Sequence, residues 1–178
     1  MFEIEITDKY FGLKETQLQN PRTRLGARGV IEDKNGNIAI FNKSFKNEYK
    51  LPGGGIEENE DKYTSFAREV MEEVGCTIKD VEFVGTVKEI ESKENFVQES
   101  YVFFAKVDKL TSTLHLTEKE QEEGARLLWL NPIRALRTMQ DCLTQLKESK
   151  YDNIYRSKFM VVRDIEILKK YLDSNKKF

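Results

Sequence analysis

The chain has 178 residues, two cysteines and a formal net charge of −2, and this length suffices for a single domain with a full core across residues 1–178. The near-neutral charge excludes a broad basic field for a nucleic-acid duplex, and no apolar run reaches the length of a membrane span. Cys76 and Cys142 lie far apart and outside any CxxC motif, so neither a disulfide framework nor a zinc site follows from them, and a reducing cytoplasm is expected.

The first half of the chain predicts strands joined by short turns. An N-terminal strand is expected within residues 1–20, because apolar residues alternate there with polar ones, at Phe2, Ile4 and Ile6. This acidic, alternating start is not a signal peptide. A second strand is expected over 25–32. The dipeptide Asn35-Gly36 between two apolar runs then predicts a hairpin, and a short strand precedes Pro52.

The second half predicts further strands followed by helices. Strands are expected over 81–90 and 96–107, separated by a polar loop. The centre of the latter, 101–104, is apolar on both faces, which is typical of a strand covered on two sides. A last strand over 127–130 leads into Asn131-Pro132, an N-cap and first-turn proline for a helical region over 132–178. The order of elements predicts an α/β fold with a mixed β-sheet flanked by helices.

Between these halves, a predicted helix concentrates negative charge on one face. Glu69, Glu72 and Glu73 fall within an arc of roughly 100° at helical spacing. A like-charged pair four residues apart costs about 0.2–0.5 kcal/mol, and the helix dipole disfavours negative charge near the C-terminal end. A solvated, exposed face and a cation site both explain such a cluster. The opposite face is expected to enter the core through Tyr63, Ala67, Val70 and Val74.

The glycines before this helix favour the cation site. Three consecutive glycines, 53–55, let the backbone adopt positive φ and come close to a ligand. From Gly54 the chain reads five residues, Glu60, seven residues, Arg68-Glu69-Val70, one residue, Glu72-Glu73, one residue, Gly75. This pattern resembles the Nudix box of MutT-type pyrophosphohydrolases at every fixed position. Cys76 stands where that family usually has an aliphatic residue.

The resemblance implies a single Nudix hydrolase domain with an α/β/α sandwich fold. It implies hydrolysis of the diphosphate linkage in a nucleoside diphosphate derivative, either a nucleoside triphosphate or an NDP-X compound, by water attack at phosphorus. Oxygen ligands without Cys or His independently favour Mg²⁺ or Mn²⁺ over zinc. The alternative is a catalytically silent Nudix-fold sensor or regulator that binds a nucleotide. Because such relatives often lack one or more box glutamates, the complete set here favours catalysis.

The resemblance also assigns roles by position. The catalytic residues are expected to be Arg68, Glu69, Glu72 and Glu73, with Glu69 also a candidate base. The expected metal ligands are Glu69, Glu72, Glu73, the carbonyl of Gly53, and one acidic residue of a later loop, with Glu123 preferred and Glu120 or Glu122 as alternatives. Substrate binding is expected at Gly54, Gly55, Arg24 and Arg28. The sequence leaves open the exact nucleotide, the phosphorus attacked, and whether the chain forms a homodimer.

Overall fold

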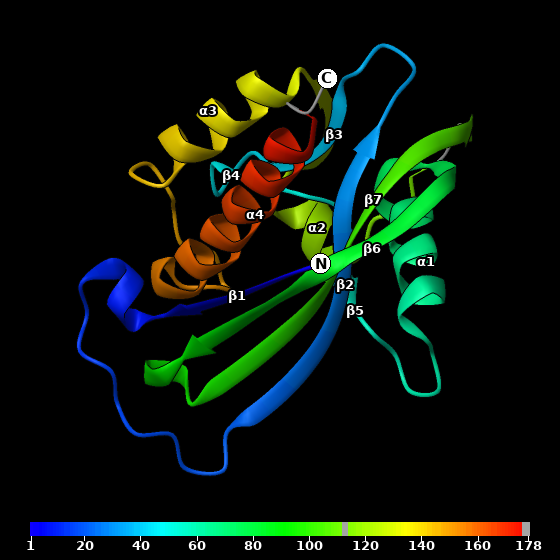
Figure 1. Cartoon of the computed structure of the whole chain (residues 1–178). Helices are drawn as coiled ribbons and strands as arrows, with labels where there is room; N and C mark the ends of the chain where they lie inside the picture. Colours follow the sequence, from blue (N-terminus) through cyan, green and yellow to red (C-terminus); the bar gives the residue numbers. More distant parts are fainter. Residues whose placement is uncertain (112–113, 176–178) are drawn as a thin grey trace.

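The computed structural model describes residues 1–111 and 114–175, and these form a mixed sheet of eight strands between layers of helices (Figure 1). The main strand order is β1 (Phe2–Thr7), β6 (Cys76–Glu91), β7 (Phe96–Leu110), β2 (Arg22–Glu32), β3 (Ile38–Lys43) and β4 (Glu48–Lys50). Off this path, β5 (Gly53–Gly55) pairs with β2, and β8 (Ala125–Leu130) pairs with β3. The β1–β6 and β2–β7 pairs are parallel, whereas the others are antiparallel. The predicted α/β fold with a mixed sheet is confirmed.

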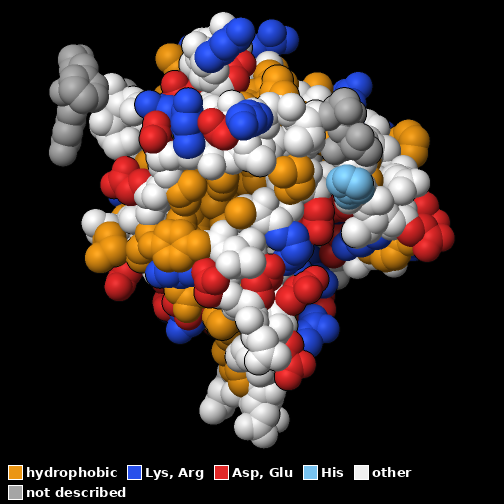
Figure 2. Space-filling view, turned by 90° about the vertical axis from the view of Figure 1, so that its right-hand side faces the viewer, with side chains coloured by type: hydrophobic (Ala, Val, Ile, Leu, Met, Phe, Trp, Pro, Cys, Tyr) orange, Lys and Arg blue, Asp and Glu red, His pale blue; other side chains and the backbone are white. Residues whose placement is uncertain are grey.

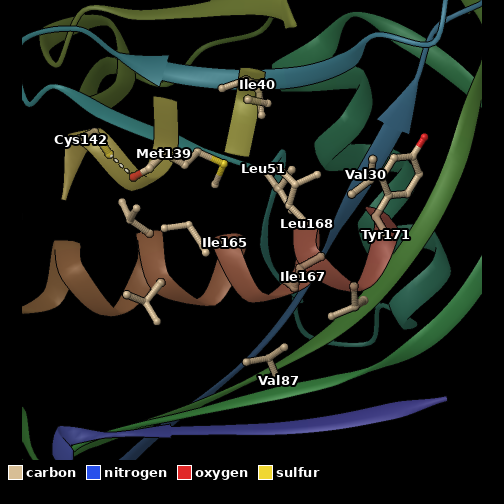
Figure 3. Close-up of a cluster of buried hydrophobic side chains, with 14 of the residues drawn as sticks. Val30, Ile40, Leu51, Val87, Met139, Cys142, Ile165, Ile167, Leu168 and Tyr171 are labelled. Atoms are coloured by element: carbon tan, nitrogen blue, oxygen red, sulfur yellow. Dashed lines mark hydrogen bonds between the residues drawn. The ribbon is translucent and has the colours of Figure 1, made fainter. Parts of the chain in front are cut away.

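Two helices cover one face of the sheet and enclose the larger core. They are α3 (Pro132–Cys142) and α4 (Ile154–Asn175), and they pack on each other as well as on the strands. Figure 3 shows side chains from both helices meeting those of the strands, among them Val30, Ile40, Leu51, Met139, Ile165 and Leu168. Ten of the 22 residues of α4 are buried, and most of these are apolar, so one side of the helix packs into the core.

On the opposite face, α1 (Lys62–Val74) covers a smaller core. The predicted core face of α1 was partly wrong. Val70 and Val74 are buried as expected, but Tyr63 is 49% exposed and Phe66 is fully buried. The Phe66 ring stacks on that of Phe103 from β7 at 4.8 Å between centroids. Ala67 is also exposed. This contact with the sheet rotates the helix relative to the sequence-based expectation, because a phenylalanine buries more apolar area than an alanine.

Short helices and turns complete the fold. They are η1 (Asp8–Phe11), η2 (Ser92–Glu94) and α2 (Glu118–Glu122). The start of α3 follows the prediction, with the Asn131 side chain accepting from the N–H groups of Ile133 and Arg134 and with proline in the first turn. The hairpin between β2 and β3 also forms as predicted, and Gly36 adopts a positive φ of 76° there. None of the described helices combines the length and apolarity required to cross a bilayer.

Candidate active site

A cavity of about 580 Å³ lies where α1, α2, α4 and the strands of the sheet meet. Its walls are mostly charged, and they include both glutamates and basic side chains. On the α1 side of the molecule, acidic and basic side chains lie interspersed at the surface, next to a band of hydrophobic ones (Figure 2). The cavity brings together most of the residues that the sequence singled out, namely Arg24, Arg28, Gly53, Gly54, Gly55, Arg68, Glu69, Glu72, Glu73 and Glu120.

The glycine run forms the floor of this cavity because it packs directly against β2. Gly53 has a φ of 139°, and a Cβ atom there would lie 2.4 Å from the Cβ of Arg28. A Cβ on Gly54 would lie 2.4 Å from Oε1 of Glu69. The fold therefore requires glycine at position 53, by conformation and close approach, whereas a side chain at position 54 would displace the Glu69 carboxylate.

Glu73 is the most buried of the box glutamates, at 2% exposure. Its Oε2 accepts a hydrogen bond of 2.7 Å from the N–H of Gly53, and its Oε1 lies 2.9 Å from Nζ of Lys50 on β4. Burial raises the pKa of Glu73, and these two partners offset only part of that effect. Burial alone would lower the pKa of Lys50, but the neighbouring carboxylate outweighs it and the pKa is raised. Of the two explanations that the sequence offered for the glutamate cluster, a solvated, exposed face does not hold for Glu73.

Arg68 holds the other carboxylates of the box. Its Nε and Nη2 form a two-bonded contact with Glu60, at 2.9 and 3.0 Å, which lowers the pKa of Glu60 to about 2. Nη1 donates to Glu69 at 2.8 Å and to Glu72 at 3.3 Å. Nη2 also donates to the carbonyl of Gly55 at 3.0 Å. The Arg68 guanidinium therefore connects α1 to the glycine run of β5 and holds the carboxylates of Glu69 and Glu72 in position.

The oxygen-rich donor set suits a hard divalent cation, but its carboxylates are engaged by the protein's own cations. Within residues 1–111 and 114–175, no three Asp, Glu, His or Cys side chains gather as a ready ligand group. Lys50 neutralises Glu73, whereas Arg68 shares a single positive charge among Glu60, Glu69 and Glu72. Carboxylate and carbonyl oxygens are the ligands that Mg²⁺ and Mn²⁺ prefer. The residues fit such an ion chemically, provided that Lys50 yields its place beside Glu73.

Of the three glutamates that the sequence offered in the later loop, Glu120 lines the cavity and the preferred residue, Glu123, does not. Glu123 does not line the cavity; it is 2% exposed and bonds to Nζ of Lys43 at 2.6 Å and to the Ser149 hydroxyl at 2.7 Å. Glu122 pairs with Lys150 at 2.6 Å. Glu120, by contrast, lines the cavity. Thr117 and Glu120 form a capping box, a pattern visible in the sequence that sets where the short helix α2 begins.

Two arginines of β2 lie in the cavity as the sequence predicted. Arg28 is only 5% exposed, and its Nε donates to the Ser100 hydroxyl at 3.1 Å. Burial lowers the pKa of Arg28 to about 10. Arg24 is more exposed, and its guanidinium packs against Gly55. Sequence reasoning did not identify three further cavity residues, Lys50, Arg156 and Arg163. The last two lie on one face of α4, seven residues apart, which is a detectable helical spacing.

We expect Gly54→Ala to reduce activity strongly while leaving stability nearly unchanged. The added methyl group would collide with the Glu69 carboxylate, which lies at the end of a flexible side chain and can move aside. A displacement of about 1 Å in a catalytic group can cost roughly 100-fold in rate. Steady-state kinetics and thermal unfolding of the variant measure the two effects separately. Wild-type activity in a folded variant would contradict a role for Glu69 at its present position.

Comparison with known proteins relates both sequence and fold to one family. The NUDIX domain family model matches residues 22–150. The fold is similar to that of a NUDIX hydrolase from Nitrosomonas europaea, with a TM-score of 0.62, 15% identity, and coverage of 86% of this chain and 90% of the other. It is also similar to a MutT protein from Methanosarcina mazei Go1, with a TM-score of 0.56, 16% identity, and coverage of 89% and 99%. No curated protein sequence matches the chain.

Proposed function

Because this chain belongs to the NUDIX domain family and is a hydrolase, we propose that it hydrolyses the diphosphate linkage of a nucleoside triphosphate or an NDP-X compound, with Mg²⁺ or Mn²⁺ as cofactor. One observation carries this proposal: the box glutamates and the β2 arginines line the same cavity. Carboxylates can hold a divalent cation, while guanidinium groups bind phosphate oxygens in a two-bonded geometry.

The two buried free thiols, Cys76 and Cys142, support a cytoplasmic location.

In this proposal the ligands of the cation are the carboxylates of Glu69, Glu72 and Glu73 and the carbonyl of Gly53. Glu120 supplies the loop carboxylate in place of Glu123, because it is the loop glutamate on the cavity wall. When bound, the cation neutralises charge on the substrate phosphates and on the departing group. Lys50 acts as a counter-charge for Glu73 when that position carries no divalent cation.

The protein side chains orient the substrate and accept the proton. Arg28 binds non-bridging oxygens of the cleaved diphosphate from the β2 side of the cavity, and Arg24 binds the substrate farther out along the same strand. Arg68 keeps the Glu69 carboxylate in place through Oε1. We assign the Oε2 atom of Glu69 as the acceptor of the proton that the attacking water loses, in line with general base catalysis. The negative charge that develops at phosphorus is then stabilised by preorganised guanidinium groups.

A panel of nucleoside triphosphates, ADP-ribose and nucleotide sugars tests this function. We expect hydrolysis of at least one member with Mg²⁺ or Mn²⁺, identified by whether phosphate, pyrophosphate or a nucleoside monophosphate is released. Chelation with EDTA should abolish the activity, and added Mg²⁺ should restore it. Calorimetry on the same panel provides the contrast: tight nucleotide binding without any phosphate release would support the silent sensor instead.

A further inference from the structure

Beyond the glutamates, the cavity continues along a row of arginines. Arg22, Arg24 and Arg28 alternate on β2 and therefore share one face of the strand. Arg156 of α4 meets them at the cavity mouth, where it shares a recess with Arg22, Arg24 and Phe96. We call Arg22, Arg24, Arg28 and Arg156 the arginine wall. The recess at the outer end of the arginine wall is lined by no box glutamate.

Carboxylates of the protein offset only part of the positive charge of the arginine wall. Arg156 is paired, with Nε 3.3 Å from Oε2 of Glu91. In the described part of the chain, Arg22, Arg24 and Arg28 form no ion pair. Arg28 is the most informative of them, because it is 5% exposed and its one side-chain hydrogen bond is to a neutral hydroxyl. The carboxylates of Glu73, Glu89 and Asp164 act on Arg28 from beyond ion-pair distance, so part of the cost of burying its charge remains. An anionic ligand would offset that part.

Aromatic rings around the cavity are already engaged by cations. Phe96 has the guanidinium carbons of Arg22 and Arg156 at 4.8 and 5.2 Å from its centroid. Tyr151, the aromatic residue of the main cavity, has the ammonium groups of Lys119 and Lys150 at 5.1 and 4.9 Å. Cation–π contacts of this kind compete with stacking of a base on the same rings. Recognition at this end of the cavity therefore depends on charge more than on stacking.

We propose that the arginine wall is a metal-independent anion subsite, which binds a phosphate on the X group of the substrate, beyond the diphosphate that is cleaved. The inference rests on the proposed function, because it assumes that the cleaved diphosphate lies at the box glutamates. The preferred substrates are then diphosphates whose X group is itself phosphorylated. A sugar phosphate is the simplest group of this class. Arg24 and Arg156 bind this anion and Arg22 closes the outer end, while Arg28, at the inner end, remains with the diphosphate that is cleaved.

Metal-free binding of inorganic pyrophosphate tests the subsite without depending on catalysis. In EDTA the box glutamates repel phosphate, so calorimetric binding reports on the arginines. We expect wild-type protein to bind pyrophosphate and Arg24→Gln to bind it about tenfold more weakly, the loss of one charge-assisted contact. Arg137→Gln, which removes an exposed arginine of α3, should bind like wild type. The proposed subsite is contradicted if the wild type does not bind pyrophosphate, or if Arg24→Gln and Arg137→Gln bind it equally.

A matched ligand pair tests the position of the second phosphate. ADP-ribose and ADP-ribose 1″-phosphate differ only by a phosphate on the X group, and both can be titrated in EDTA. We expect the phosphorylated ligand to bind about tenfold more tightly to the wild type, and this preference should shrink in Arg24→Gln but not in Arg137→Gln. Equal affinities in the wild type overturn the assignment to the X group. If both binding results hold and Mg²⁺ supports no turnover of any diphosphate, the subsite stands and the proposed hydrolysis fails.

Discussion

Glu73→Gln should abolish turnover and also destabilise the protein. Glu73 is the buried carboxylate at the centre of the proposed cation site. Its loss should remove several kcal/mol of transition-state stabilisation, which corresponds to a rate lower by a factor of about 10³ or more. The same change leaves the Lys50 ammonium, 9% exposed, without its partner. Removing one member of a buried ion pair costs about 3–5 kcal/mol. Initial rates at saturating Mg²⁺ and urea unfolding measure the two losses.

Two further variants separate catalysis from folding. Lys50→Met combined with Glu73→Gln removes both charges, and we expect it to recover much of the lost stability but none of the activity. Glu72 has a side chain that is 38% exposed and a single guanidinium contact. Glu72→Gln should therefore change the free energy of unfolding by less than about 1 kcal/mol while still reducing the rate. Full turnover in Glu73→Gln, with a substrate that the wild type hydrolyses, would exclude the box from the mechanism.

The parts of the site that depend on local spacing could be predicted from the sequence. The glycine run, Arg68 and the three box glutamates occupy one short segment, so their order along the chain largely determines how they meet. The contact between Arg68 and Glu60 spans only eight residues. The mixed sheet was predictable for a similar reason, because alternation and turn residues report directly on each strand.

Contacts between distant segments could not be predicted in the same way. Lys50 reaches Glu73 only because β4 and β5 bring the chain past the end of α1, 23 residues away in sequence. The exposed Tyr63 and buried Phe66 depend on how α1 lies on Phe103, which helical periodicity alone does not determine. The loop glutamate is an intermediate case. Glu120 rather than Glu123 lines the cavity; the capping box of α2 is visible in the sequence, but the position of α2 beside the cavity is not.

Buried charges on α4 hold the segment that precedes the glycine run of β5. We therefore expect a second large loss of stability when one of these charges is removed. Arg163 is 1% exposed and donates from Nη1 to Glu89 at 3.0 Å and from Nε to Asp164 at 2.7 Å. Asp164 in turn accepts from the backbone N–H of Leu51 at 2.9 Å. Leu51 lies two residues before Gly53. The network therefore connects α4 to the strand that leads into the cavity floor.

Arg163→Met should destabilise the protein by about 3–5 kcal/mol, because it leaves the carboxylates of Glu89 and Asp164 buried without their shared cation. Urea unfolding measures this loss, and Arg137→Met on the exposed face of α3 is the control, with an expected change within about 0.5 kcal/mol. Adding Glu89→Gln to Arg163→Met should recover part of the stability, since one of the two uncompensated charges is then removed. Activity should fall in the folded fraction as well, because Asp164 no longer holds Leu51 in a fixed position. If the free energy of unfolding falls by less than about 1 kcal/mol, water or another side chain replaces the Arg163 guanidinium. The glycine run then does not depend on α4 for its position.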